Sequence, residues 1–195
     1  EMWFRCDDDD IEEGLFYFAT SLSGFVSSDG ASLKRKDDNT LELLLKTSTS
    51  GVQIFTTTNT YPKQTWHHIA LVRSSTSVSG VISFFVNGIR LYTINDIGVI
   101  SRLQICRVGS ALNFDNSLSP SVALNIDDVR FTLDARYDAT ASSITVPTGK
   151  LPVGFPVLED PNWKDVVLRV DFDDGDFNDL SPNNSTFVND GVVAT

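Results

Sequence analysis

The sequence contains few of the residues on which several protein classes depend. Its 195 residues include two cysteines, two histidines and one methionine. No stretch of about 18 apolar residues occurs, which excludes a membrane-spanning helix. Cys6 and Cys106 cannot form a disulfide framework, and they lack the spacing of metal ligands. Each lies in an apolar run, so two buried thiols are expected, with a long-range bridge between them as the alternative.

Positive charge is also scarce. The 15 basic side chains are outnumbered by 26 acidic ones, and the formal net charge is -11. Such a chain repels a phosphate backbone, so nucleic-acid binding is not expected, and anionic membrane surfaces are disfavoured for the same reason. Hydrophobic residues make up 41% of the chain, enough for the core of one medium domain, or of one domain and part of a second.

Helical periodicity is nearly absent, and the secondary-structure signal is almost entirely β. Segments rich in Val, Ile, Phe, Thr and Tyr recur between clusters of Ser, Asn, Asp and Gly, which is the pattern of a sandwich or barrel. The last segment is ambiguous, because Trp163, Val166 and Val170 also fit one face of a helix. The expected strands are 1–6, 15–19, 40–47, 52–57, 66–73, 81–86, 89–93, 103–108, 123–132 and 166–172.

One hairpin is clearly marked in the sequence. Two β-rich runs, 81–86 and 89–92, are separated by Asn87-Gly88. This dipeptide is the strongest short-range signal for a hairpin, because both residues of a type I′ turn take positive φ. A β-branched residue in place of Gly88 is therefore expected to damage folding. The run 66–73 carries bulky residues on both faces, as a strand in the middle of a layer does.

Four segments occur in an order and spacing that resemble one known family. They are Glu1-Met2-Trp3-Phe4-Arg5, Trp66-His67-His68-Ile69-Ala70-Leu71-Val72-Arg73, Phe84-Phe85-Val86-Asn87-Gly88 and Ile126-Asp127-Asp128-Val129-Arg130-Phe131. Together with Ala135-Arg136-Tyr137 they resemble the laminin-G-like, concanavalin A-like lectin and glucanase domain over roughly residues 1–150. The resemblance implies an all-β fold, an antiparallel two-sheet jelly-roll sandwich.

Within this family, the resemblance is to domains of structural proteins. The segment Ile126 to Thr132, the following Ala135-Arg136-Tyr137 and the proline-containing stretch from Val146 to Pro152 look most like modules of bacteriophage virion proteins and large bacterial surface proteins. In those proteins such a domain is usually an appendage or an adhesion module. This step is an analogy from family, and a fold alone does not determine a function.

The C-terminal part departs from a simple one-domain organisation. Residues 160–175 and 179–184 resemble segments that open such a domain, whereas residues 1–6 resemble a strand that lies well inside one. The chain has no initiator methionine and no signal-peptide pattern, so it is expected to be cut from a longer polypeptide. We expect a sandwich over 1–157, without its usual opening strands. Residues 158–195 then either open a following repeat or supply strands that complete a sandwich, and they pack on a sandwich in both cases.

Catalytic patterns are missing. Retaining glycan hydrolysis needs two carboxylates about 5 Å apart, and the few glutamates form no such pair along one strand. Asp127 and Asp128 are adjacent, so their side chains point to opposite faces of a strand, and the same holds for His67 and His68. No nucleophile triad, phosphate loop or nucleophile elbow is visible. We expect no enzyme, no catalytic residues and no cofactor.

The acidic clusters allow two interpretations. Asp171, Asp173, Asp174, Asp176, Asn178 and Asp179 carry oxygen ligands of the type that calcium prefers, but they miss the EF-hand register. A solvated turn is the favoured interpretation, and a calcium site at the sandwich rim is the alternative. A second acidic run, 7–10 with Glu12 and Glu13, is expected to be a soluble loop. No metal ligand is therefore assigned.

These observations predict a non-catalytic adhesion or assembly module of a large virion structural protein, such as a phage tail fibre, an appendage or a capsid decoration. The alternatives are a bacterial extracellular adhesin and a glycan-cleaving domain. The expected location is a virion or the extracellular space, and the expected partners are neighbouring subunits and a cell-surface glycan. The ligand-binding residues are unknown from sequence, and Tyr61, Tyr92 and Tyr137 are conceivable platforms for sugar rings.

Overall fold

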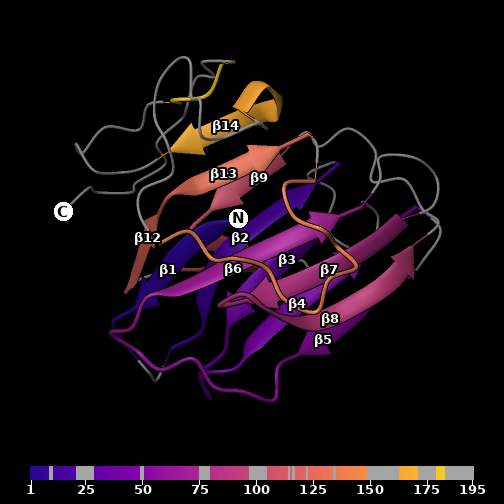
Figure 1. Cartoon of the computed structure of the whole chain (residues 1–195). Helices are drawn as coiled ribbons and strands as arrows, with labels where there is room; N and C mark the ends of the chain where they lie inside the picture. The colour runs from indigo at the N-terminus through magenta and orange to yellow at the C-terminus, as the bar shows by residue number, and fades with distance from the viewer. Residues whose placement is uncertain are drawn as a thin grey trace.

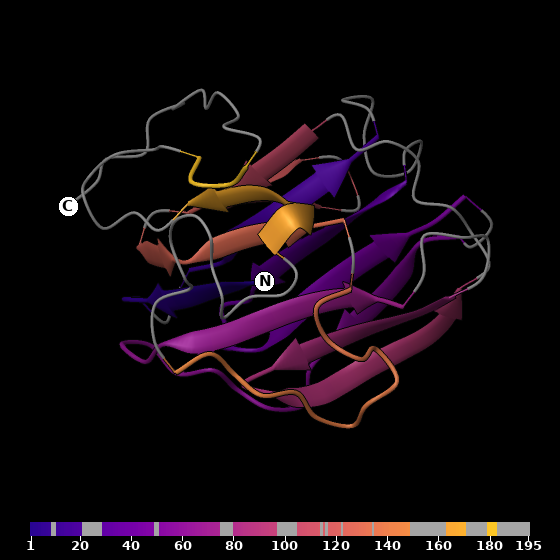
Figure 2. The same cartoon turned by 45° about the horizontal axis from the view of Figure 1, so that its top comes forward.

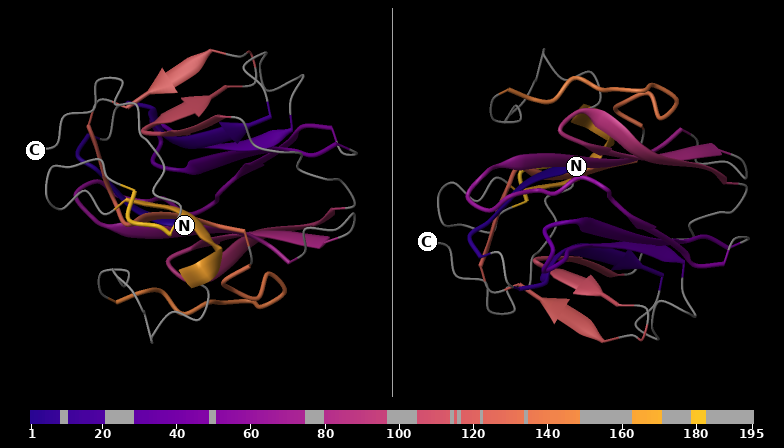
Figure 3. Two further views of the ribbon diagram at one scale, coloured as in Figure 1. Left: turned by 90° about the horizontal axis from the view of Figure 1, so that it is seen from above. Right: turned by 90° about the horizontal axis from the view of Figure 1, so that it is seen from below.

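The computed structural model describes residues 1–8, 11–20, 29–48, 51–74, 80–96, 105–113, 115, 117–121, 123–133, 135–148, 163–170 and 179–182. The all-β expectation is confirmed: two antiparallel five-stranded sheets lie face to face as two layers (Figure 1, Figure 3). In this part of the chain no helix combines the length and apolar character needed to cross a membrane.

The two layers, here called sheet I and sheet II, are built from strands distant in sequence. The strand order of sheet I is β12-β1-β6-β7-β8, and that of sheet II is β5-β4-β3-β2-β9. Sheet I contains β1 (Met2–Cys6), β6 (His67–Arg73), β7 (Gly80–Val86), β8 (Ile89–Asp96) and β12 (Leu124–Asp127). Sheet II contains β2 (Glu13–Ala19), β3 (Gly30–Arg35), β4 (Leu41–Lys46), β5 (Gln53–Thr56) and β9 (Ile105–Val108).

Two short strand pairs complete the described structure. β10 (Ser110–Leu112) pairs with β11 (Leu118–Pro120), outside sheet II. β13 (Val129–Thr132) pairs with β14 (Val166–Val170), which follows the 3-10 turn η1 (Trp163–Asp165). In Figure 3, the β10 and β11 pair and the segment 135–148 lie on opposite outer sides of the sandwich.

Alternation of apolar side chains places the core between the sheets. In β1, Met2, Phe4 and Cys6 are buried, while Trp3 and Arg5 are half-buried on the opposite face. Phe4, Leu33 and Phe84 are among the fully buried residues of the main cluster, to which both sheets contribute. This period-2 burial is the pattern of strands with one face on a core.

The outer face of sheet I is partly covered by the segment 135–148. Ala139 and Ile144 from this segment contact an apolar group that includes Ala70, Val72 and Phe85. The backbone N-H of Ile144 donates to the carbonyl of Gly88 at 2.8 Å, which fixes the segment to the β7-β8 hairpin. The orange trace in Figure 1 follows this path across β6, β7 and β8.

Several sequence expectations are corrected by the structure. β3, β10 and β11 were not expected, and the predicted strand 123–132 is interrupted at Asp128, whose φ is 50°. The expected strand 166–172 is confirmed over Val166–Val170, and only the helical alternative for this segment is wrong. Cys6 is buried as expected, but Cys106 is exposed and no disulfide joins the two, so the prediction of two buried thiols is wrong for Cys106 and the alternative of a bridge is wrong as well. Residues 103, 104, 171 and 172 of the predicted strands lie outside the described residues.

Replacing Gly88 by valine is expected to destabilise the fold by about 2 kcal/mol or more. Asn87 and Gly88 have φ of 49° and 82°, as a type I′ turn requires, and a Cβ on Gly88 would lie 2.7 Å from the carbonyl oxygen of Ile144. Urea unfolding measures the change. Gly51→Val is the matched control, because a Cβ there meets no atom within 4 Å. Equal unfolding midpoints for the two variants would refute the argument.

Candidate functional site

An exposed tryptophan lies at the end of the outer face of sheet I. Trp66 immediately precedes β6 and is 40% exposed. In the pairing of β1 with β6, Phe4 lies opposite His67, so the next pair in register brings Arg5 opposite Trp66. On its other side β1 pairs with β12, where Arg5 lies opposite Asn125. Three neighbouring strands therefore present their outward side chains side by side.

These side chains form a polar and aromatic group that we call the Trp66 patch: Arg5, Asp7, Trp66 and Asn125. The guanidinium carbon of Arg5 lies 5.5 Å from the centroid of the indole, within the range of a cation-π contact. Asp7 Oδ1 lies 3.1 Å from Arg5 Nε, and Asn125 Nδ2 donates to Asp7 Oδ2 at 2.8 Å. The side chains of Arg5 and Asp7 are 35% and 42% exposed.

Backbone hydrogen bonds hold the patch in place from two sides. The N-H of Asp7 donates to the carbonyl of Ala123 at 2.8 Å, which ties the end of β1 to the start of β12. The N-H of Gln64 donates to the carbonyl of Cys6 at 2.7 Å, which ties the loop before Trp66 to the same strand end. The patch is therefore built on sheet strands and anchored turns, which keeps its geometry fixed.

The chemistry of the patch suits a ligand with both apolar and hydroxyl surfaces. The exposed indole offers a flat apolar surface with the Arg5 guanidinium over its ring, and Arg5 in turn holds the Asp7 carboxylate, so donors and an acceptor belong to the same group. A sugar ring presents one apolar face and a rim of hydroxyl groups. The patch thus supplies the two kinds of contact that recognition of a sugar requires.

The residues of the family-like segments next to the patch stabilise the fold instead. Glu1 and the side chains around its carboxylate form what we call the Glu1 network, and its members come from four parts of the chain. Glu1 Oε1 accepts from Arg130 Nε and Arg136 Nη1, both at 2.8 Å. Glu1 Oε2 lies 3.1 Å from His68 Nε2 and accepts from the Tyr137 hydroxyl. The network is nearly closed to solvent, since the Glu1 side chain is 6% exposed.

The electrostatics of this network favour an ionised Glu1. Burial alone raises the pKa of its carboxyl group, because a low-dielectric environment disfavours charge. The hydrogen bond with His68 and the positive charges of the Glu1 amino group and Arg136 outweigh burial, and they lower the pKa from 4.5 to about 2. The carboxylate therefore acts as a buried anion that joins β1, β6 and β13.

The two histidines point to opposite faces, as predicted from their adjacency. His68 joins the Glu1 network on the outer face and contacts Trp3 edge to face at 5.2 Å. His67 points into the core, where Nε2 lies 3.2 Å from the carbonyl of Pro62 and Nδ1 lies 3.1 Å from Asn87 Nδ2. Burial lowers the pKa of His67. Both rings are engaged in contacts that hold the fold together.

The Asp127-Asp128 pair is also structural. Asp127 Oδ1 accepts from the backbone N-H of Asp128 at 2.8 Å, at the kink between β12 and β13. Asp128 is buried and forms an ion pair of 3.2 Å with Arg169 of β14. The prediction that the two carboxylates do not act as a pair agrees with these separate contacts.

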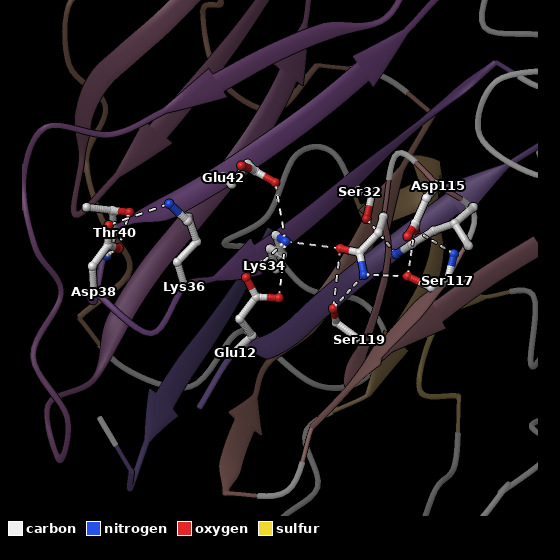
Figure 4. Close-up of polar contacts among 12 residues, drawn as sticks. Glu12, Ser32, Lys34, Lys36, Asp38, Thr40, Glu42, Asp115, Ser117 and Ser119 are labelled. Atoms are coloured by element: carbon white, nitrogen blue, oxygen red, sulfur yellow. Dashed lines mark hydrogen bonds and ion pairs between the residues drawn. The ribbon is translucent and has the colours of Figure 1, made fainter. Parts of the chain in front are cut away.

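A second polar group, the Lys34 cluster, lies on the outer face of sheet II (Figure 4). Lys34 Nζ lies 3.2 Å from both carboxylate oxygens of Glu12, 3.4 Å from Glu42 Oε1 and 3.0 Å from Asn113 Oδ1. Asn113 in turn donates to the hydroxyls of Ser117 and Ser119 at 3.0 Å. The Lys34 side chain is only 12% exposed, so this cluster fastens the β10 and β11 pair to sheet II.

The tyrosines considered from the sequence are engaged elsewhere. Tyr61 is 6% exposed and belongs to the main core. Tyr92 stacks on Phe55 with ring centroids 4.8 Å apart, against the same core. Tyr137 donates its hydroxyl proton to Glu1. Among the side chains that the structure describes, the exposed aromatic residue is Trp66, which the sequence analysis placed in an expected strand and in a family-like segment. The outward position of Trp66 follows from its register with Arg5, and this register is known only once β1 and β6 are paired.

The acidic loop considered for calcium is described only at its end. Residues 171–178 lie outside the described residues, and Asp179 accepts from the backbone N-H of Arg169 at 3.0 Å and from Ser181. Across the described ranges, no group of three or more His, Cys, Asp or Glu side chains could hold a metal ion. The calcium alternative stays a prediction.

The arrangement of these elements defines the class as a two-sheet antiparallel jelly roll. The family model of the concanavalin A-like lectin/glucanases superfamily, in its laminin-G-like form, matches residues 1–139, and the chain belongs to this family. A solved structure of the native heptameric SAP-like pentraxin from Limulus polyphemus is similar, with 18% identity and a TM-score of 0.44. The match covers 65% of this chain and 59% of the pentraxin chain. None of the curated proteins compared with the chain matches it.

Proposed function

We propose that this chain is a non-catalytic adhesion or assembly module of a large virion structural protein, and that it binds a cell-surface glycan through the Trp66 patch. The observation that carries the glycan part is the exposed indole of Trp66, which contacts Arg5, with Asp7 and Asn125 linked to that arginine by an ion pair and a hydrogen bond. Membership of a lectin and glucanase superfamily supports a sugar as the ligand. The virion context rests on the resemblance of residues 126–137 to modules of that kind, and a bacterial extracellular adhesin is the alternative context.

The engagement of the glutamates supports a non-catalytic role. Each of the four described glutamates is held by the protein itself. Glu1 lies in its network, Glu13 accepts from the backbone N-H of Ala123 at 2.9 Å, and Glu12 and Glu42 share the ammonium group of Lys34. A glycosidase requires one carboxylate as acid and another as nucleophile or base, both directed at the substrate. The carboxylates of Glu12 and Glu42 are directed at Lys34 instead.

Replacing Trp66 by alanine is expected to weaken glycan binding at least about tenfold, which corresponds to about 1.4 kcal/mol. The substitution removes the stacking surface but no core contact, so the unfolding midpoint should stay nearly unchanged. A glycan array on the wild-type chain identifies the sugar, and titration calorimetry of both chains with that sugar measures the change. Trp66→Phe keeps an aromatic face and should lose less.

The matched control is Leu118→Ala, which removes an exposed apolar side chain on β11, outside the opposite sheet. It should leave glycan affinity unchanged. Equal affinity of the wild-type and Trp66→Ala chains would show that another surface binds the sugar. A wild-type chain that binds nothing on the array would refute the glycan part, and release of reducing ends from a bound glycan would refute the non-catalytic part.

A further inference from the structure

The edge of the sandwich at β13 is filled by a strand from the far end of the chain. β14 pairs antiparallel with β13 from Val129 opposite Val170 to Thr132 opposite Val166, and among the described strands it pairs with no other. Figure 2 shows β14 lying along β13, with η1 at its start. On its other side β13 is bonded to Glu1, since the N-H of Arg130 donates to the Glu1 carbonyl at 2.9 Å.

The contacts of β14 with the rest of the chain are specific. Val166 and Val170 are buried, at 1% and 2% exposure. Arg169 is fully buried and reaches Asp128 with an ion pair of 3.2 Å. The N-H of Leu133 donates to the carbonyl of Asp165 at 2.8 Å and extends the pairing by one residue. A short stretch, 128–133, therefore provides the hydrogen bonds of the ladder and the ionic partner.

The far side of β14 is closed by residues that follow it. Asp179 Oδ1 accepts from the backbone N-H of Arg169 at 3.0 Å, and the N-H of Leu180 donates to the Arg169 carbonyl at 2.8 Å. Asp179 is itself fixed by Ser181 through two bonds of 2.9 Å. Asp179 and Leu180 thus bind the outer edge of β14 at Arg169, which blocks that edge against a further strand.

An edge such as β13 needs an occupant. Without β14 it would present unpaired backbone groups beside Phe131, whose ring packs against Phe18 with centroids 6.5 Å apart. The segment 163–182 of a second copy would make the same contacts as the chain's own, so exchange between copies changes no contact of the pair. Residues 149–162 connect the two parts in sequence, and such a stretch can span roughly 45 Å when extended.

We propose that residues 128–133 form a strand-acceptor site that binds the segment 163–182 of a second copy of this chain, so that copies assemble by strand exchange. This inference rests on the assembly part of the proposed function and specifies its partner. A tethered strand has an effective concentration in the millimolar range. Exchange is therefore minor in dilute solution and becomes substantial where copies are crowded, as they are in a particle or a fibre.

Cross-linking between chains that each carry one introduced cysteine, and whose native Cys6 is buried, tests the proposal. All chains carry Cys106→Ser, which removes the exposed thiol. A chain with Phe131→Cys is mixed with a chain carrying Leu168→Cys at roughly 1 mM, and the mixture is oxidised mildly. These positions are opposite each other in the register, so exchanged copies should give a covalent heterodimer on a non-reducing gel. A second register-matched mixture, Val129→Cys with Val170→Cys, should do the same and covers the case in which one variant does not fold.

The matched controls combine the same cysteines out of register. Phe131→Cys with Val170→Cys, and Val129→Cys with Leu168→Cys, are two residues out of register, which puts their Cα atoms beyond the separation of about 7 Å that a disulfide spans. They should give at most a minor product. Heterodimers in neither matched mixture, or equal yields in matched and mismatched ones, would overturn the proposal. The Trp66→Ala variant tests glycan binding, and the cross-linking tests strand exchange. Heterodimers without glycan binding would refute only the glycan part, and glycan binding without heterodimers would refute only the exchange.

Discussion

Replacing Arg130 by methionine is expected to lower the free energy of unfolding by about 3 to 5 kcal/mol, because it removes one partner of a buried ion pair. The Arg130 side chain is 1% exposed and its Nε donates to Glu1 Oε1 at 2.8 Å. Methionine fills a similar volume, so the loss reports the uncompensated carboxylate rather than a cavity. Urea unfolding followed by circular dichroism at pH 7 measures the change.

Arg136→Met is the matched control, since Arg136 Nη1 lies 2.8 Å from the same carboxylate oxygen. Its side chain is 23% exposed, so water replaces much of the lost contact, and the expected loss is only about 1 kcal/mol. In a Glu1→Gln background, Arg130→Met should cost clearly less than in the wild type, because no buried anion is left behind. Equal losses for the two arginine variants would mean that burial does not set the strength of this pair.

The Glu1 network explains why the sequence predicted the fold well. His68, Arg130, Arg136 and Tyr137 lie in three of the segments that resemble the family, and all of them meet at Glu1. These residues of the family-like segments therefore connect β1, β6 and β13 to the segment 135–148. A resemblance based on these residues predicts the sandwich but does not identify a ligand, because the residues stabilise the fold.

The strands that sequence reasoning missed lack a hydrophobic signal. β3 includes Ser32, Lys34 and Arg35, yet Arg35 is fully buried and Ser32 accepts from the N-H of Leu112 at 2.8 Å. β10 and β11 have three residues each, too few for a period to show. Partners from distant strands satisfy these polar groups, and such partners are not visible before the sheets are assembled.

The candidate site was invisible for a related reason. Trp66 is part of a motif whose neighbours are buried, and nothing in the local sequence separates its exposed ring from a core aromatic. Its exposed position opposite Arg5 depends on cross-strand register. The placement of the C-terminal part likewise depends on pairing with a distant strand. The pairing of β14 with β13 occupies an edge, and whether residues 158–195 complete this sandwich or open another repeat stays a prediction that the exchange experiment addresses.

Acidification is expected to remove roughly 3 kcal/mol of stability through Glu1 alone, because its pKa falls from 4.5 to about 2 on folding. A depressed pKa means that the folded state binds the proton more weakly than the unfolded chain. The contribution is therefore complete above pH 4.5 and is lost as the pH falls toward 2.

Exposed aspartates with lowered pKa values, such as Asp38 and Asp138, add to the acid sensitivity of the chain. Urea unfolding of the wild type and of Glu1→Gln from pH 7 to pH 2 separates the two sources, because both chains carry these aspartates. The difference between the two free energies should shrink by about 3 kcal/mol over this range. A difference that does not vary with pH would show that Glu1 is not ionised in the folded protein, and the buried anion that joins the three strands would have to be replaced by a neutral, hydrogen-bonded carboxyl group.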